Sequence, residues 1–207
     1  SGPQPTFARD GQGRVLESRA ILDEGSGWIG KEQTDERVEK MRRAGFNVYI
    51  PCVWHGRGTW WPSTLEPPQK ELAEKLKAES DDPLAHLIAR CHEAGIEVHP
   101  WFCVSKRERD LHPEFTEETT PKGFFDVHRP EFRDFIVDLM LDVIRRYEVD
   151  GINLDYIRSG GVCTGPKCRE EYRARFGTEL LEDLKLKEAI RNTVGQIVGM
   201  RYVEVDT

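Results

Sequence analysis

The stretch VDGINLDYIR, residues Val149 to Arg158, decides the predicted fold of this chain. Polar and apolar residues alternate in it, so in an extended strand the apolar side chains face one way and Asn153 and Asp155 the other. Burying a carboxylate costs free energy unless a partner compensates it. The pattern therefore predicts a functional Asp155 near the end of a strand. The competing interpretation is a structural Asp155 that caps the next loop or pairs with Arg158.

Outward from this stretch, short strands alternate with amphipathic helices along the chain. Apolar periodicity and helix-capping residues define these elements. Strands are predicted at residues 19–23, 46–54, 96–104 and 149–158, with a candidate fifth strand at 202–205. Helices are predicted at residues 34–44, 83–94, 130–147, 168–176 and 181–199. Four strand–helix units in series predict a parallel sheet with right-handed crossovers.

Two architectures fit this order of elements: a doubly wound sheet and part of a (β/α)8 barrel. No G-x-G-x-x-G or P-loop follows a strand, which removes the best support for a nucleotide-binding sheet. Long connections at residues 55–80 and 105–129 follow the second and third strands, and loops of that length are typically functional or disordered. Both connections would lie at the carboxyl end of the sheet, which favours the barrel. Residues 1–17 show no clear periodicity and are predicted to form an N-terminal arm. Residues 18–207 are predicted to form a TIM-barrel-type α/β domain covering about the first four units.

Composition and charge exclude some classes of partner. The chain has 207 residues and a formal net charge of −7, with both signs mixed along it. Nucleic-acid partners are not expected, because their footprint is basic and clustered. No apolar run approaches the roughly 18 residues that a membrane helix needs. The chain begins with Ser1-Gly2-Pro3, which is typical of an expression scar or a processed end, so any targeting segment would be invisible. Unpaired barrel edges predict a homo-oligomer.

Five cysteines are an odd number, so they cannot all pair with one another. Cys163 and Cys168 have C-x4-C spacing in a loop rich in Gly and Pro, and a disulfide is the preferred interpretation, followed by free thiols. A metal ranks last, because structural zinc takes four protein ligands and only these two lie close in sequence. We expect no metal and no cofactor. The other three cysteines are expected to be packed: Cys52, Cys91 and Cys103.

Seven segments of the chain stand in the order found in one bacterial family. They are Arg19, 44–48, 82–84, 95–102, 112–115, 130–133 and 147–158. On these residues the chain resembles the glycoside-hydrolase-like TIM-barrel family (glycosyl-hydrolase-like family 10), which contains peptidoglycan-glycan hydrolases of the divisome-localised type. The resemblance covers about residues 19–176. Ser159-Gly160-Gly161 departs from the usual Tyr-Pro, Cys103 stands where a polar residue is expected, and the second half of the barrel is missing.

The resemblance implies a carbohydrate substrate, cleavage of O-glycosidic bonds in a polysaccharide or cell-wall glycan, and an extracytoplasmic location in a bacterium. Most glycosidases flank the bond with two carboxylates. Asp155 is the predicted catalytic carboxylate, with Arg19 and Arg158 expected to keep it ionised. Sugar rings favour flat aromatic faces and hydrogen-bonding side chains. The predicted substrate-binding residues are Arg19, Trp54, His55, Trp60, Trp61, His99, Trp101, Asn153, Tyr156 and Arg158.

Several alternatives stay open at this point. A His or Trp on a strand is more often a core residue than a ligand contact. A non-catalytic carbohydrate-binding or truncated barrel fragment would bind sugar without turnover. A metal-dependent hydrolase or deacetylase is the third alternative, although no H-E-x-x-H spacing supports it. Its candidate ligands are His55, His99, Asp126, His128 and Asp155. The sugar, the linkage and the partner carboxylate are not predicted.

Overall fold

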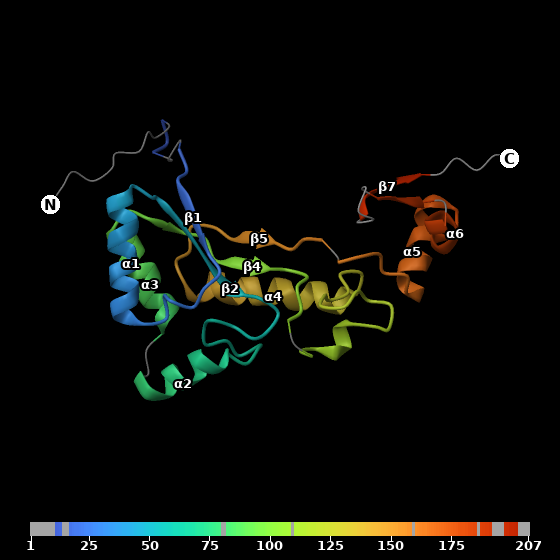
Figure 1. Cartoon of the computed structure of the whole chain (residues 1–207). Helices are drawn as coiled ribbons and strands as arrows, with labels where there is room; N and C mark the ends of the chain where they lie inside the picture. The colour runs from blue at the N-terminus through green and yellow to red at the C-terminus, as the bar shows by residue number, and fades with distance from the viewer. Residues whose placement is uncertain are drawn as a thin grey trace.

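The computed structural model describes residues 11–13, 17–79, 82–108, 110–158, 160–185, 187–191 and 197–202. One parallel sheet contains five strands: β1 (Ala20–Asp23), β2 (Val48–Trp54), β3 (Glu97–Val98), β4 (Trp101–Cys103) and β5 (Asn153–Asp155). β2 pairs with β1 on one side and with β3 and β4 on the other, and β4 pairs with β5. The predicted order and direction of the strands are confirmed, and the sheet curls as part of a barrel (Figure 1).

Local sequence signals explain where the helices begin and end. The helices are α1 (Lys31–Ala44), α2 (Lys70–Glu79), α3 (Pro83–Glu93), α4 (Pro130–Arg146), α5 (Pro166–Phe176), α6 (Leu180–Lys185) and the short 3-10 helix η1 (Pro113–Phe115). The Asp82 carboxylate accepts the N–H groups of Leu84 and Ala85 at 3.1 and 3.2 Å, so α3 is capped as predicted. α1 ends at Gly45 with φ 79°, a left-handed conformation that glycine adopts without strain. α2 lies inside the connection predicted at residues 55–80.

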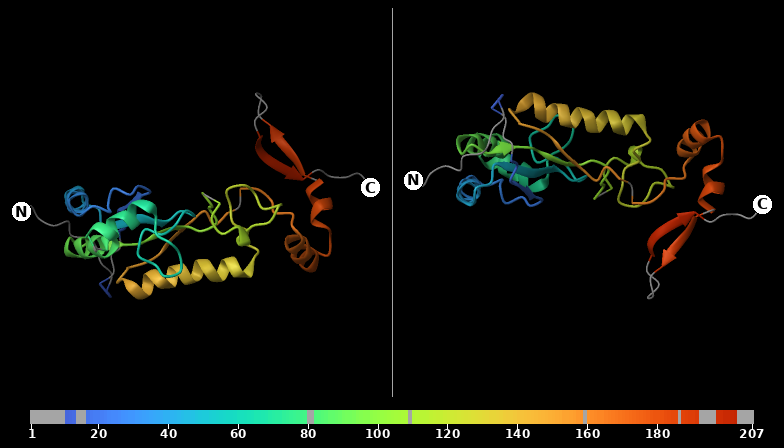
Figure 2. Two further views of the ribbon diagram at one scale, coloured as in Figure 1. Left: turned by 90° about the horizontal axis from the view of Figure 1, so that it is seen from below. Right: turned by 90° about the horizontal axis from the view of Figure 1, so that it is seen from above.

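Helices α1, α3 and α4 pack on the outer face of the curled sheet (Figures 1 and 2). Tyr49, Val53 and Phe102 of this face are fully buried. They join one apolar cluster with residues of α1, α3 and α4, among them Met41, Leu84, Leu87, Ile136 and Leu139. A second buried cluster occupies the inner face and contains Val48, Ile50, Cys52, Trp101 and Cys103. Both faces are apolar at mid-strand, so the polar positions lie toward the strand ends.

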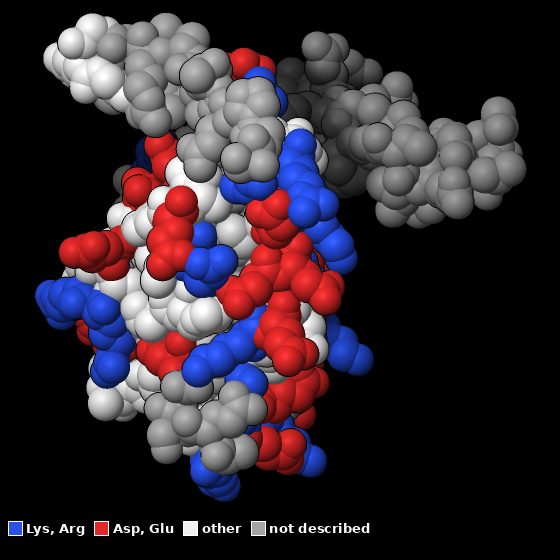
Figure 3. Space-filling model, turned by 90° about the vertical axis from the view of Figure 1, so that its left-hand side faces the viewer, with Lys and Arg blue, Asp and Glu red and all other residues white. Residues whose placement is uncertain are grey.

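The surface over α1 and α3 carries both signs of charge side by side (Figure 3). Asp35 of α1 accepts a hydrogen bond from Arg90 Nε of α3 at 2.9 Å, which links the two helices. On α1 itself, Glu39 accepts from Arg42 and Arg43. No helix among the described residues is long and apolar enough to cross a membrane.

Two predicted elements need correction. The third strand is interrupted at His99-Pro100, where proline has no N–H to donate, and it forms two short strands. The predicted helix at residues 181–199 is wrong. α6 ends at Lys185, and β6 (Lys187–Arg191) and β7 (Ile197–Tyr202) form a separate antiparallel pair. In β7, Gly199 disfavours a helix, and the β-branched residues Ile197 and Val198 favour a strand. β7 pairs with β6 and not with the parallel sheet.

Some predictions fall on residues outside the described ranges. These are most of the N-terminal arm at residues 1–17 and residues 203–205 of the candidate fifth strand. The part of that strand that is described, Tyr202, ends β7.

Candidate functional site

The carboxyl end of the parallel sheet gathers titratable side chains from several strand ends. Glu24 follows β1, His55 follows β2, Glu108 lies beyond β4, and Asp155 ends β5. In barrel enzymes this edge carries the chemistry. His55 and Asp155 are predicted from the sequence, whereas Glu24 and Glu108 are functional candidates that the sequence pattern did not indicate. Their position just past predicted strands was the available signal.

Gly56 brings the loops after β2 and β4 into backbone contact. Its φ is 67°, and a Cβ built on it would lie 1.9 Å from the carbonyl oxygen of Lys106. The N–H of Glu108 donates to the Gly56 carbonyl at 3.1 Å. Because only glycine combines this φ with so close an approach, Gly56 determines that Glu108 reaches His55.

His55 lies buried between two carboxylates, with its side chain 3% exposed. Its Nε2 is 2.6 Å from Glu24 Oε1, and its Nδ1 is 2.6 Å from Glu108 Oε1. Arg57 Nη1 donates to the other oxygen of Glu108 at 2.7 Å. A hydrogen bond with Cys103 and the nearby carboxylates raise the pKa of His55, although burial of the ring acts in the opposite direction. The arrangement therefore favours the protonated imidazole.

Cys103 connects this histidine to Asp155. It is fully buried and is the register partner of Asp155 in the β4–β5 pair. Hydrogen bonds with Cys52 and His55 lower the pKa of the Cys103 thiol, while burial and the charge of Asp155 oppose them. The unexpected cysteine thus takes part in a polar network at the strand end.

Asp155 is held by its own loop. Its Oδ1 accepts the N–H of Tyr156 at 2.6 Å and lies 3.6 Å from Arg158 Nη1. Its side chain is 33% exposed, and that of Arg158 is 64% exposed. Tyr156 has φ 49°, a conformation that is uncommon for residues other than glycine and that often occurs at functional sites. The predicted pairing of Asp155 with Arg158 is present.

The backbone after β5 is tied to the loop after β4. The N–H of Ser105 donates to the Tyr156 carbonyl at 3.1 Å, and its hydroxyl donates to the Arg158 carbonyl at 2.5 Å. The guanidinium of Arg158 lies 4.3 Å and the ammonium of Lys106 4.8 Å from the Tyr156 ring centre. These contacts place two cations against the Tyr156 ring, and one of them, Arg158, also pairs with the candidate carboxylate Asp155.

A cavity of about 320 Å³ lies against this network. Its lining is mostly polar and comes from the loop after β4, including Arg107, Glu108, Lys122 and Phe124. The Phe124 ring lies 6.3 Å from that of Tyr156. The volume is at the lower end of the range for small-ligand sites.

Two predicted site residues lie away from this end. Arg19 is at the amino end of the sheet, where its Nε donates to the Gly45 carbonyl at 2.7 Å and its N–H donates to Asn47 Oδ1 at 2.6 Å. On the order of 20 Å of strand separates Asn47 from the carboxyl end of β2, so the expected pairing of Arg19 with Asp155 is wrong. His99 is 3.1 Å from Glu97 and packs on Gly151, four residues before Asp155.

The tryptophans need a further correction. Trp54, Trp60 and Trp61 are at most 5% exposed and belong to the outer-face cluster. Trp61 Nε1 donates to Asp142 at 2.8 Å, and its ring packs edge-on against Phe102. Their ring faces are therefore covered by protein and offer no platform for a sugar. Trp101 lies on the inner face next to Asn153 and is 8% exposed.

The alternative set of metal ligands does not assemble as one site. His55 and Asp155 belong to the carboxyl-end network, and His99 pairs with Glu97. Asp126 and His128 lie instead beside Cys163 and Cys168, whose thiols are free. The predicted disulfide is therefore absent, and four potential ligands occur where the sequence analysis counted two.

Comparison with known proteins identifies the family. Residues 22–178 match the model of the family described as glycosyl hydrolase-like 10. The chain belongs to this family. The family and the curled parallel sheet together confirm the predicted fold class, a partial barrel of the (β/α)8 type.

Two curated relatives of the chain are named as glycosyl hydrolases. The chain is 26% identical over 143 residues to the glycosyl hydrolase YngK of Bacillus subtilis (strain 168), covering 60% of this chain and 28% of that protein. It is 24% identical over 143 residues to the glycosyl hydrolase DigH of Escherichia coli (strain K12), covering 58% and 33%. The chain thus spans about a third of the length of these relatives.

A solved structure supports the fold. The chitobiase of Flavobacterium johnsoniae superposes with a TM-score of 0.51 at 13% identity, covering 82% of this chain and 28% of that chain. Family membership supports a glycosyl-hydrolase-like protein, and the divisome-localised type stays a prediction.

Proposed function

We propose that this chain is part of a glycoside hydrolase that cleaves O-glycosidic bonds of a polysaccharide or cell-wall glycan, with Asp155 as one of two catalytic carboxylates. One observation carries the proposal. The Asp155 carboxylate is one-third exposed on the inner face of a partial barrel, at the carboxyl end of β5, with Arg158 Nη1 3.6 Å away. Membership of the glycosyl hydrolase-like 10 family supports the reaction class.

The chemistry requires a fixed negative charge beside the sugar. Glycoside cleavage passes through a transition state with positive character at the anomeric carbon, which a carboxylate stabilises as nucleophile or by its charge. The hydrogen bond from the Tyr156 N–H orients Asp155 before substrate arrives. Asn153, Tyr156 and Arg158 surround it and are partly or largely exposed, so they remain our proposed sugar contacts.

Glu108 is our first candidate for the partner carboxylate. It lines the cavity beside the network and is paired with His55 and Arg57. Glu24 shares His55 but is 62% exposed on the far side of it. A partner carboxylate outside this chain is also compatible with the chemistry, because the match covers only 28% and 33% of the curated relatives. If the substrate is a cell-wall glycan, the protein acts outside the cytoplasm.

The test compares two Asp→Asn variants in the longest native form of the protein. Asp155→Asn keeps size and hydrogen bonding but removes the charge. We expect turnover of a polysaccharide or glycan-strand substrate to fall roughly a thousandfold or more, equivalent to about 4 kcal/mol of barrier, with little change in melting temperature. The measurements are the rate per folded molecule and the thermal melt.

Asp150→Asn is the matched control on the same segment. Asp150 accepts the Val98 N–H at 2.8 Å and pairs with His92, so its loss should lower stability and leave the rate per folded molecule near normal. Near-normal turnover in a folded Asp155→Asn protein ends the assignment. Sugar binding without turnover in the wild type would instead favour a non-catalytic binding barrel.

A further inference from the structure

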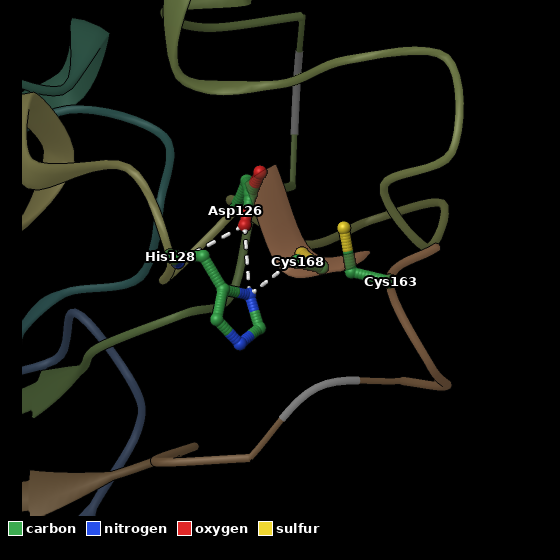
Figure 4. A group of neighbouring side chains, drawn as sticks. All are labelled: Asp126, His128, Cys163 and Cys168. Carbon is green, nitrogen blue, oxygen red and sulfur yellow. Dashed lines mark hydrogen bonds and ion pairs between the residues drawn. The ribbon is translucent and has the colours of Figure 1, made fainter. Parts of the chain in front are cut away.

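Four side chains from separate segments converge beyond the carboxyl-end network. Asp126 and His128 precede α4, Cys163 follows β5, and Cys168 lies in the first turn of α5 (Figure 4). One ligand atom from each lies within 4.8 Å of all the others. Among the described residues this is the only group of at least three His, Cys, Asp or Glu side chains with that convergence.

The distances match the edges of a metal tetrahedron. His128 Nδ1 is 3.2 Å from Asp126 Oδ1 and 3.2 Å from Cys168 Sγ. Zinc bonds of about 2.0–2.3 Å to oxygen, nitrogen and sulfur give ligand–ligand edges of about 3.3–3.8 Å in a tetrahedron. A shift of a few tenths of an ångström would therefore accommodate the ion.

A buried oxygen in the cluster lacks a partner. Asp126 is 2% exposed, and its Oδ2 has no hydrogen-bond partner among the described residues. Its other oxygen accepts the N–H of His128 at 3.0 Å. Leaving a buried carboxylate oxygen unsatisfied is costly, so the site calls for a cation. Cys163 and Cys168 are also buried, at 7% and 5% exposed, whereas the His128 side chain is 40% exposed.

Two other uses of these residues fit the geometry less well. A Cys–His–Asp nucleophile relay needs the thiol and the carboxylate on opposite ring nitrogens, but here both contact Nδ1 of His128. A Cys163–Cys168 disulfide would leave the buried oxygen of Asp126 without a partner. A single ion bound by the two thiolates, the imidazole and the Asp126 carboxylate explains why the ligands converge and puts a positive charge beside this buried carboxylate.

We propose that Asp126, His128, Cys163 and Cys168 bind one structural Zn²⁺ ion. Two thiolates and an imidazole suit zinc, and four protein ligands leave no open position for substrate. The ion would join the turn before α4 to the segment that follows Asp155, the last residue of β5. Its role would be to fix that segment rather than to take part in the reaction.

The first measurement is the metal content of the reduced, full 207-residue chain after dialysis against metal-free buffer. We expect near-stoichiometric zinc in the wild type and in the control Cys91→Ala, whose cysteine is buried in α3 away from the cluster. Cys163→Ser and Cys168→Ser should retain only trace zinc. Asp126→Asn should weaken zinc binding by roughly tenfold or more.

A second measurement does not depend on the folding of any variant. Wild-type protein stripped with a chelator should melt at a lower temperature and recover on adding zinc. Cobalt added to the stripped protein should give sulfur-to-cobalt charge-transfer absorption and the visible bands of a tetrahedral site. Trace zinc in the wild type with no such absorption would overturn the proposal. So would a Cys163–Cys168 disulfide in the purified protein, or full zinc content in both serine variants.

Discussion

The two faces of the curled sheet are built differently. On the outer face, Tyr49, Val53 and Phe102 are completely buried beneath α1, α3 and α4, and the polar atoms of Tyr49 and nearby Trp61 have carboxylate partners. On the inner face, the Nε1 of Trp101 is buried without a partner among the described residues, and the strand ends carry Cys103 and Asp155. The difference teaches that the outer face, which is covered by helices, provides stability, while the inner face places the titratable groups Cys103 and Asp155 at its strand ends, where ligands can reach Asp155.

The two faces are open at opposite edges of the sheet. Leu22 of β1 faces inward and is 58% exposed, whereas Leu154 of β5 faces outward and is 50% exposed. No described helix packs on Leu154, because α5 and α6 lie away from the sheet (Figure 2). These are the edges that further barrel units would cover. Association of two chains through them stays a prediction.

The largest expected loss of stability distinguishes Phe102 from Leu154, two register partners whose side chains both face outward. Phe102→Ala should lower the free energy of unfolding by about 3–5 kcal/mol, because it leaves a cavity in the main core. Leu154→Ala, on the neighbouring strand, should cost less than about 1 kcal/mol because half of that side chain is already in solvent. Denaturant titration measures both. Equal costs would mean that the edge of β5 is covered in solution.

A smaller effect compares one tryptophan from each face. Trp61→Phe removes the hydrogen bond from Nε1 to Asp142, and its loss should cost about 1.5–3 kcal/mol because the acceptor is charged. Trp101→Phe removes an indole N–H that has no partner among the described residues and should cost distinctly less. If the order is reversed, the inner-face N–H has a partner in solution. Chemical denaturation of both variants at one pH decides the order.

The smallest effect is a pH dependence of the loops beside the outer face. Burial alone would lower the pKa of His112, but its hydrogen bonds with Glu114 and Glu66 raise it. Burial also raises the pKa of Glu66. Both groups hold protons more tightly when folded. The contribution of His112 is therefore full below about pH 6.5 and is lost as the pH rises through its folded pKa.

Melting temperature measured from pH 6 to pH 9 tests this sign. The wild type should lose stability with rising pH. The double variant His112→Gln with Glu66→Gln should show a flatter profile, because neither group can then titrate. A wild-type profile that rises over this range would contradict the assignment.

Much of the fold follows from local sequence patterns. The alternation in residues 149–158, the Asp82-Pro83 helix start and the four strand–helix units predict a parallel sheet in the observed order. These predictions succeed because periodicity and capping act over a few residues, and because crossover handedness leaves few topologies. Asp155 reaches the carboxyl end of its strand for the same local reason.

The tertiary structure alone decided which residues meet across long loops. Trp60 and Trp61 looked like exposed loop aromatics, but packing against Phe102 and Trp28 buries them. Glu108 reaches His55 only because Gly56 allows two loops to touch. Asp126 and His128 lie about 40 residues before the cysteines that they meet. Residue type and spacing do not encode such contacts, since burial and loop path depend on how the whole chain packs.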